Sequence, residues 1–229
     1  EFMHQCVEIG VGSLGIVILI SIFMGAVSTV QTSYQLVSPL ISKSTIAQIV
    51  RDTVILEFAP TLVCIVLAGV IGSKIASELG NMRVSEQIDA LEIMGINTKT
   101  YLVMPKIVAS LVTIPMLVVL AMGLGIYGGR LAGSMAGILS VEDYDKGLME
   151  NFMPYNVTFS LIKAYTFAFI ISTISAYFGY YVKGGSVEIG KASTQAVGYQ
   201  TKVNELAQFF TGGNTSSAKN TSTDSKTTE

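Results

Sequence analysis

Residues 107–129 read IVASLVTIPMLVVLAMGLGIYGG and carry no charged side chain. A helix rises about 1.5 Å per residue, so this stretch is long enough to cross the roughly 30 Å hydrocarbon layer of a membrane. Three more uncharged runs lie at 9–42, 58–73 and 164–182. Because a water-soluble domain distributes charge over its surface helices, this pattern predicts an all-α polytopic membrane protein with about four transmembrane helices.

The uncharged runs also give bounds for the four spans. We expect the spans at about 11–30, 54–72, 107–132 and 164–182. The second extends beyond its run because that run is too short to cross, and this puts Glu57 in its first turns. Lysine and arginine are most frequent at 73–106 and after Val182, and retained positive charge marks the cytoplasmic side. We therefore expect both ends of the chain and the segment 73–106 in the cytoplasm.

Composition excludes several classes of function. The formal net charge is −2 and the basic residues are dispersed, so we expect no nucleic-acid binding. Cys6, Cys64 and the single His4 form neither a disulfide framework nor a metal-ligand set, and no nucleophile with its base is visible. Two G-x-G-x-x-G matches, at 10–15 and 123–128, lie in apolar runs rather than after a strand, which argues against nucleotide binding. We expect no enzyme active site, metal or cofactor.

Glycines recur at every fourth position in and after the third span, at Gly125, Gly129, Gly133 and Gly137. On one face of a helix, missing side chains let a second helix approach closely within lipid. Two interpretations remain open, a static packing seam, which we favour, and a bundle or dimer seam that slides.

The segment 81–95, NMRVSEQIDALEIMG, is amphipathic but too short and too charged to cross a membrane. Asn81 suits an N-cap and Gly95 a left-handed C-terminal cap, which predicts a helix from about Met82 to Met94. The residues alone favour two roles equally. The helix either receives force from a soluble motor or lies at the interface and closes a loop.

Glu57 and Pro60 form the other unusual feature, at the start of the second span. An ionisable side chain there is costly unless it faces a cavity, a partner or the interface. Pro60 removes a backbone donor and can open space beside Glu57. Glu57 then either contacts a polar headgroup or gate, which we favour, or reaches to the interface as we expect for Arg51 and Asp52.

The character of the chain changes after Val197. Tyr199, Val203, Leu206 and Phe210 recur at helical spacing and predict a short amphipathic helix, either on the membrane surface or solvated. The segment 211–229, TGGNTSSAKNTSTDSKTTE, is too polar to offset the entropy of ordering, and we expect it to be disordered. We therefore divide the chain into a transmembrane domain, 1–197, and a polar tail, 198–229.

Four stretches together resemble the MlaE-type permeases, the membrane subunits of lipid-transporting ABC systems that work with MCE proteins. They are LEFAPT at 56–61, LAGVIGSKIASELGNMRVSEQIDALEIMGIN at 67–97, YLVMPKIVASLVTIP at 101–115 and GIYGGRLAG at 125–133. The similarity covers Phe2 to Val197. It implies a homodimeric permease of the bacterial inner membrane that moves phospholipid but hydrolyses nothing itself. ATP would be bound by a partner ATPase subunit, and an MCE-domain protein would lie on the periplasmic side.

The resemblance also implies roles for individual residues. In the family, the segment between the second and third spans is the coupling helix that docks into the ATPase. The matching residues are Glu78, Gly80, Met82, Arg83, Glu86, Gln87, Asp89, Ala90, Leu91 and Met94. The family's lipid pathway lies between two protomers, at positions that correspond to Gln31, Tyr34, Glu57 and Pro60.

The sequence departs from the family pattern at two places. Many members have arginine directly before the acidic residue, where this chain has Leu56. Members also continue after a motif like GKASTQAV, residues 190–197, into a fifth span, where this chain has the polar tail. We therefore expect four spans with the last one missing. The alternatives are a non-transporting membrane scaffold or channel, and an inactive truncated permease.

Overall fold

The computed structural model describes residues 2–35, 43–137, 139–182 and 186–224. All regular structure in these ranges is helical, as the sequence predicted, and η marks a π-helix. The helices are α1 Phe2–Gln35, α2 Lys43–Thr53, η1 Val54–Leu62, α3 Val63–Leu67, η2 Ala68–Gly72, α4 Ser73–Val84, α5 Gln87–Ile93, η3 Lys99–Val103, α6 Met104–Met135, α7 Val141–Met149, α8 Pro154–Tyr180 and α9 Ser186–Asp224.

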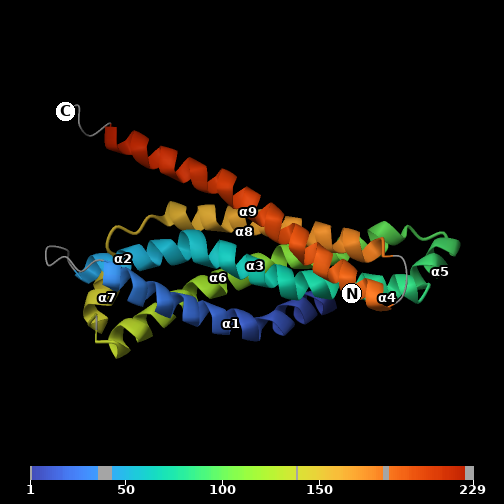
Figure 1. The fold of residues 1–229 in the computed structure, drawn as a ribbon, viewed down its shortest axis with the longest axis horizontal. Coiled ribbons are helices and arrows are strands. Elements are labelled where there is room, and N and C mark those ends of the chain that lie inside the picture. Colours follow the sequence, from blue (N-terminus) through green and yellow to red (C-terminus); the bar gives the residue numbers. More distant parts are fainter. Residues whose placement is uncertain (1, 36–42, 138, 183–185, 225–229) are drawn as a thin grey trace.

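Four helical stretches are long and apolar enough to span a membrane: Gln5–Gln35, Ser44–Val84, Lys99–Met135 and Pro154–Tyr180. The predicted number of spans is confirmed. Figure 1 shows these stretches side by side along the long axis of the molecule. We call the end that carries α5 and the amino terminus of α1 the α5 end, and the opposite end, with α2 and α7, the α7 end.

The second span is longer than predicted. It runs without interruption through α2, η1, α3, η2 and α4, and covers 41 residues. Two of these segments are π-helical, and one of them, η1, contains Pro60. A proline removes one backbone N–H from a helix, and local π-helical geometry is one way in which the remaining groups adjust.

Glycines bring α1 and α6 into close contact. A Cβ atom added at Gly25 would overlap the carbonyl oxygen of Gly125, and one at Gly128 would lie 2.5 Å from the carbonyl oxygen of Ile22. A Cβ at Gly129 would lie 2.6 Å from the Thr29 hydroxyl oxygen. The glycine series therefore lies against α1 of the same chain.

Gly137 is an exception within that series. It follows the end of α6, has a φ of +65° and has open space where a side chain would lie. Because α6 ends at Met135, the repeating face ends there too, and Gly137 provides the left-handed conformation that closes a helix. The prediction that it belongs to the packing face is wrong.

Tyr144 of α7 lies at the same seam. Its hydroxyl donates to the carbonyl oxygen of Ile126, 3.2 Å away, and would be 2.7 Å from a Cβ at Gly129. Burial raises the pKa of Tyr144 to about 12. The side chain therefore fills the space that the glycine leaves, as a neutral donor, and ties α7 to α6.

Helix α9 differs most from expectation. It continues from Ser186 to Asp224, where the sequence predicted a short helix followed by a disordered segment from Thr211. No proline interrupts it. Its first half is anchored by buried contacts with α4 and α8, and a helix propagates more easily from an established turn than it nucleates. Residues 225–229 of the expected disordered tail lie outside the described part of the chain.

The anchored half of α9 lies along the spans. Gln200 and Asn204 are buried, and Gln200 Nε2 donates to the Ile171 carbonyl oxygen at 2.9 Å and to the Ser175 hydroxyl, both within α8. Figure 1 shows α9 starting at the α5 end, crossing α8 and then diverging from the bundle. The predicted surface or solvated helix is instead packed against the membrane-spanning helices.

Candidate functional site

The segment between the second and third spans is two helices rather than one. α4 continues through Asn81 to Val84, and α5 begins at Gln87. Between them the backbone of Glu86 is left-handed, with a φ of 56°. The N–H and hydroxyl of Ser85 both donate to the Asn81 carbonyl oxygen, at 3.0 and 2.6 Å, and close α4. The predicted N-cap at Asn81 is therefore wrong. The predicted left-handed Gly95 is confirmed, with a φ of +78°.

Contacts on both sides hold α5 in position. Arg83 of α4 forms an ion pair with Asp89 of α5, at 2.6 Å, across the turn. On the other side Glu92 accepts hydrogen bonds from the Tyr180 hydroxyl at 3.0 Å and the Thr98 hydroxyl at 3.1 Å. Because Tyr180 is the last residue of α8, α5 is joined to the fourth span as well as to the second.

The residues predicted to couple to an ATPase fall into groups. Side chains at the tip of the segment are exposed, and these are Glu86, Gln87 and Met94. Others bind within the protein or pack against its core, and these are Arg83, Asp89, Met82 and Leu91. Glu78 lies deeper and pairs with the buried Lys106 of α6. The exposed group is the part that a partner can reach.

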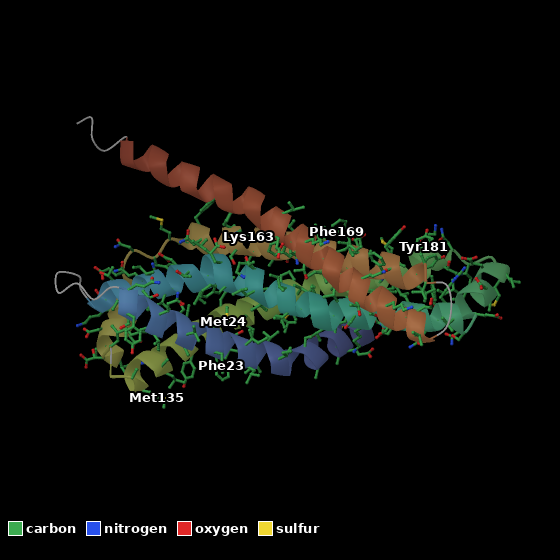
Figure 2. All side chains as sticks on the ribbon, viewed as in Figure 1. Phe23, Met24, Met135, Lys163, Phe169 and Tyr181 are labelled. Carbon is green, nitrogen blue, oxygen red and sulfur yellow. The ribbon has the colours of Figure 1, made fainter. Side chains whose placement is uncertain are left out.

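A second polar site lies toward the α7 end, where Glu57 of η1 contacts Lys163 of α8. The carboxylate Oε1 of Glu57 is 3.6 Å from Lys163 Nζ. The Lys163 side chain is 2% exposed, and that of Glu57 is 41% exposed. Lys163 Nζ also lies 5.2 Å from the centroid of the Phe159 ring. Figure 2 shows Lys163 on α8, toward the α7 end.

Besides Glu57, this lysine has a backbone partner on the second span, one turn before Pro60. In a regular α-helix the Leu56 carbonyl would accept from the N–H of residue 60, which proline does not have. Lys163 Nζ donates to that carbonyl oxygen at 3.2 Å. Lys163 of α8 therefore contacts the second span at both Leu56 and Glu57.

Sequence reasoning missed Lys163 because it predicted the fourth span to begin at Ala164. In the structure α8 begins at Pro154, so Lys163 is well inside the span. The available signal was helical spacing, because Ser160, Lys163 and Phe167 recur three and four residues apart and are all buried. A charged residue on such a face is a candidate for function.

The remaining predicted lipid-pathway residues lie near the carboxyl end of α1. Gln31 is exposed and Tyr34 is 74% exposed. Figure 1 shows this end of α1 at the α7 end of the bundle. They do not form the contact that joins Glu57 to Lys163. The four predicted residues therefore come from two helices, Gln31 and Tyr34 from α1 and Glu57 and Pro60 from η1.

Arg51 was expected to reach the membrane interface, and this prediction is wrong. Its side chain is 3% exposed and forms an ion pair with Asp52 at 3.0 Å. It also donates to backbone carbonyl oxygens at the end of α7, those of Gly147, Leu148, Glu150 and Asn151. A buried charge with this many partners joins elements to one another, and here it fixes α2 to α7.

The chain is similar to known permeases over most of its length. The model of the family described as Permease MlaE matches residues 2–210, and so extends past the domain boundary that we predicted at Val197. A probable ABC transporter permease protein of Rickettsia bellii is 38% identical over 195 residues, which cover 85% of this chain and 75% of the relative.

Two more distant relatives have informative names. The chloroplastic protein TRIGALACTOSYLDIACYLGLYCEROL 1 of Arabidopsis thaliana is 30% identical over 85% of this chain and 55% of its own length. The intermembrane phospholipid transport system permease protein MlaE of Haemophilus influenzae is 28% identical over 201 residues, 85% of this chain and 75% of the relative.

Proposed function

Because the chain belongs to the MlaE permease family, and is thus the permease subunit of an ABC transporter, we propose that it moves phospholipid between the bacterial inner membrane and a periplasmic MCE-domain protein. The subunit is not itself catalytic and works with a separate ATPase. The name of the Haemophilus influenzae relative supports phospholipid as the cargo. The observation that carries the proposal is the buried Lys163 beside the half-exposed Glu57.

A phospholipid headgroup has the chemistry that this pair can bind. The phosphate is an anion that an ammonium group attracts, and an amine on the headgroup is a cation that a carboxylate attracts. The 3.6 Å separation of Lys163 and Glu57 is longer than the roughly 2.7–2.9 Å of a tight charge-assisted hydrogen bond. We propose that the headgroup enters beside Glu57, with its phosphate directed to Lys163.

The outer face of α1 supports a homodimer. In the most apolar stretch of each span, the share of buried residues is lowest in the first span. It is 28% there and 56% in the second span. Its exposed apolar side chains include Val11, Leu19, Phe23 and Val27. We propose that a second copy covers part of this face, so that Gln31 and Tyr34 line the lipid pathway together with Glu57.

The α4–α5 segment has the features of a coupling element. Its tip is exposed at Glu86 and Gln87, while α5 is fixed to α8 through Glu92. α4 is the end of an uninterrupted helical stretch that also contains Glu57. We propose that closure of the ATPase displaces α5, and that this stretch transmits the movement to the Glu57–Lys163 site. Such a stretch moves as a unit because its backbone hydrogen bonds are internal.

Transport by the reconstituted complex tests this function. The permease, its ATPase and its MCE partner are placed in vesicles, and ATP-dependent movement of labelled phospholipid is measured. The variant K163Q should lower transport about ten-fold, because a hydrogen bond from a charged group to the transported headgroup is lost. The matched control is K146Q, which removes an exposed lysine of α7.

The outcomes separate the alternatives. Unchanged transport in K163Q would remove this site from the pathway. If the wild-type complex retains its ATPase but moves no lipid, the chain is a non-transporting scaffold or an inactive permease.

A further inference from the structure

A cavity lies at the α5 end of the bundle, away from Glu57. Its volume is about 360 Å³, within the range of small-molecule sites. The start of α6 and the end of α8 form its walls, with Val103, Met104, Ile107, Ala176 and Tyr177 among the lining residues. This lining is apolar, so the main part of the cavity suits a hydrocarbon chain.

Lys99 is one of the residues that line this cavity. Its Nζ is 5.9 Å from the ring centroids of both Tyr180 and Tyr181, so the two rings position the ammonium group by cation–π attraction. Lys99 forms no ion pair with any carboxylate of the described residues. It is exposed and keeps its positive charge available to a ligand.

A smaller polar cavity of about 250 Å³ adjoins the apolar one and shares Lys99, Tyr180 and Tyr181 with it. Arg83 and Glu92 also line it. Arg83 is already paired with Asp89, and Glu92 already accepts from two hydroxyl groups. Lys99 is therefore the cation of this site that is left to bind an anion.

The position of the site along the spans matches a lipid headgroup region. Lys99 begins the third candidate span and Tyr180 ends the fourth. Tyr177 and Tyr181 are 61% and 52% exposed, and Figure 2 shows Tyr181 near the α5 end. Tyrosines at the ends of spans are typical of the membrane–water interface, and basic pockets between spans bind anionic headgroups.

We propose that this cavity binds one anionic phospholipid from the leaflet at the α5 end. The phosphate contacts the Lys99 ammonium group between the two tyrosine rings. One acyl chain lies along Val103, Met104 and Ile107, against Tyr177. The site is separate from the Glu57–Lys163 site, so the inference does not depend on the proposed transport function.

Lipid binding to the purified full-length chain tests the proposal. Native mass spectrometry from detergent measures adducts of phosphatidylglycerol and phosphatidylcholine with matched acyl chains. The wild-type protein should bind phosphatidylglycerol more tightly than phosphatidylcholine. K99Q should lower phosphatidylglycerol binding about five-fold, because one lysine near the headgroup is lost. Phosphatidylcholine binding should fall less, because its choline cation already offsets the charge of its phosphate.

Two controls make the result specific. K146Q removes an exposed lysine at the α7 end and should behave as wild type. T173W fills the apolar cavity from its exposed edge and should reduce adducts of both lipids, which tests the acyl-chain part independently of charge. A single monodisperse peak in size-exclusion chromatography shows that each variant is folded.

Two results would overturn the inference. The first is equal binding of phosphatidylglycerol by K99Q and wild type. The second is a preference for phosphatidylglycerol that disappears in K163Q but not in K99Q. That result would assign the anionic lipid to the Glu57–Lys163 site and would leave the transport proposal standing.

Discussion

Single residues at the α1–α6 seam show how closely the spans approach. Gly25 and Gly125 bring two backbones together without side chains between them, so the hydrogen atom of glycine is the largest group that fits. In lipid, where apolar solvent gives helices little hydrophobic reason to associate, such close packing is a main source of attraction. The seam is therefore a place where one added methyl group has a large effect.

We predict that G25A destabilises the protein by about 1–3 kcal/mol, because the new Cβ overlaps the Gly125 carbonyl oxygen and the helices must separate. Thermal unfolding of the purified protein in detergent measures the change. G123A is the matched control. Gly123 lies on α6, like Gly125, but a Cβ atom at this position meets nothing within 4 Å. Equal midpoints for the two variants would contradict the packing argument.

Residue-scale predictions from sequence were correct where the cause is local. Gly95 ends its helix in the left-handed conformation, which the neighbouring residues alone indicate. The partners of the buried Arg51 and Lys163 were missed because they are far away in sequence. Arg51 binds carbonyl groups near residue 150, and Lys163 binds Leu56. No local pattern identifies such partners.

At the scale of elements, the α4–α5 segment differs from its prediction in an informative way. The hydrophobic periodicity continues through 82–94, which favoured one helix. The ion pair between Arg83 and Asp89 and the left-handed Glu86 divide it into two. The turn leaves Glu86 and Gln87 exposed. It also makes α5 a short helix that is held near its start by Asp89 and near its end by Glu92. An exposed tip on a helix held at both ends is the arrangement on which the coupling role proposed above depends.

We predict that the double variant E86K, Q87K abolishes copurification of the ATPase without lowering the stability of the permease. Both side chains are exposed, and neither takes part in the Arg83–Asp89 pair. Reversed charge at the tip repels a partner surface that is complementary to the natural one. Pull-down from membranes measures the partner, and thermal unfolding measures stability.

The matched control for this prediction is E142K, an exposed acidic residue in the first turn of α7 at the opposite end. It should retain the ATPase. Loss of the ATPase in E142K as well would mean that net charge, rather than the tip of the α4–α5 segment, determines the contact.

For the whole molecule, charge distribution gave the correct number of apolar spans but not the course of α9. Apart from Ile189, the buried residues in the described part of α9 are small or polar, and these are Ala192, Ala196, Gln200 and Asn204. Hydropathy does not identify such a face, although small and polar side chains are what membrane helices use to pack against one another. Gln200 contacts Ser175 of α8 and packs beside Gly72 of the second span. These neighbours are far from it in sequence, so the sequence does not identify them.

The attachment of α9 gives two predictions of opposite sign. Gln200 donates to the Ile171 carbonyl oxygen and the Ser175 hydroxyl, so Q200L should lower the free energy of unfolding by about 1–3 kcal/mol, because buried acceptors lose their donor. Asn204 is buried one turn later, and neither its amide nitrogen nor its oxygen has a hydrogen-bond partner among the described residues. N204L should therefore raise the free energy of unfolding, because it removes polar atoms whose burial is uncompensated.

Thermal unfolding of the two variants side by side checks the prediction, since both introduce leucine into the same face of the same helix. If α9 were detached from the bundle, both substitutions would expose leucine to solvent or lipid and would change stability little and alike. Opposite shifts require that α9 packs on α8 over the whole stretch from Gln200 to Asn204. Equal shifts would mean that the polar tail folds independently of the membrane-spanning helices.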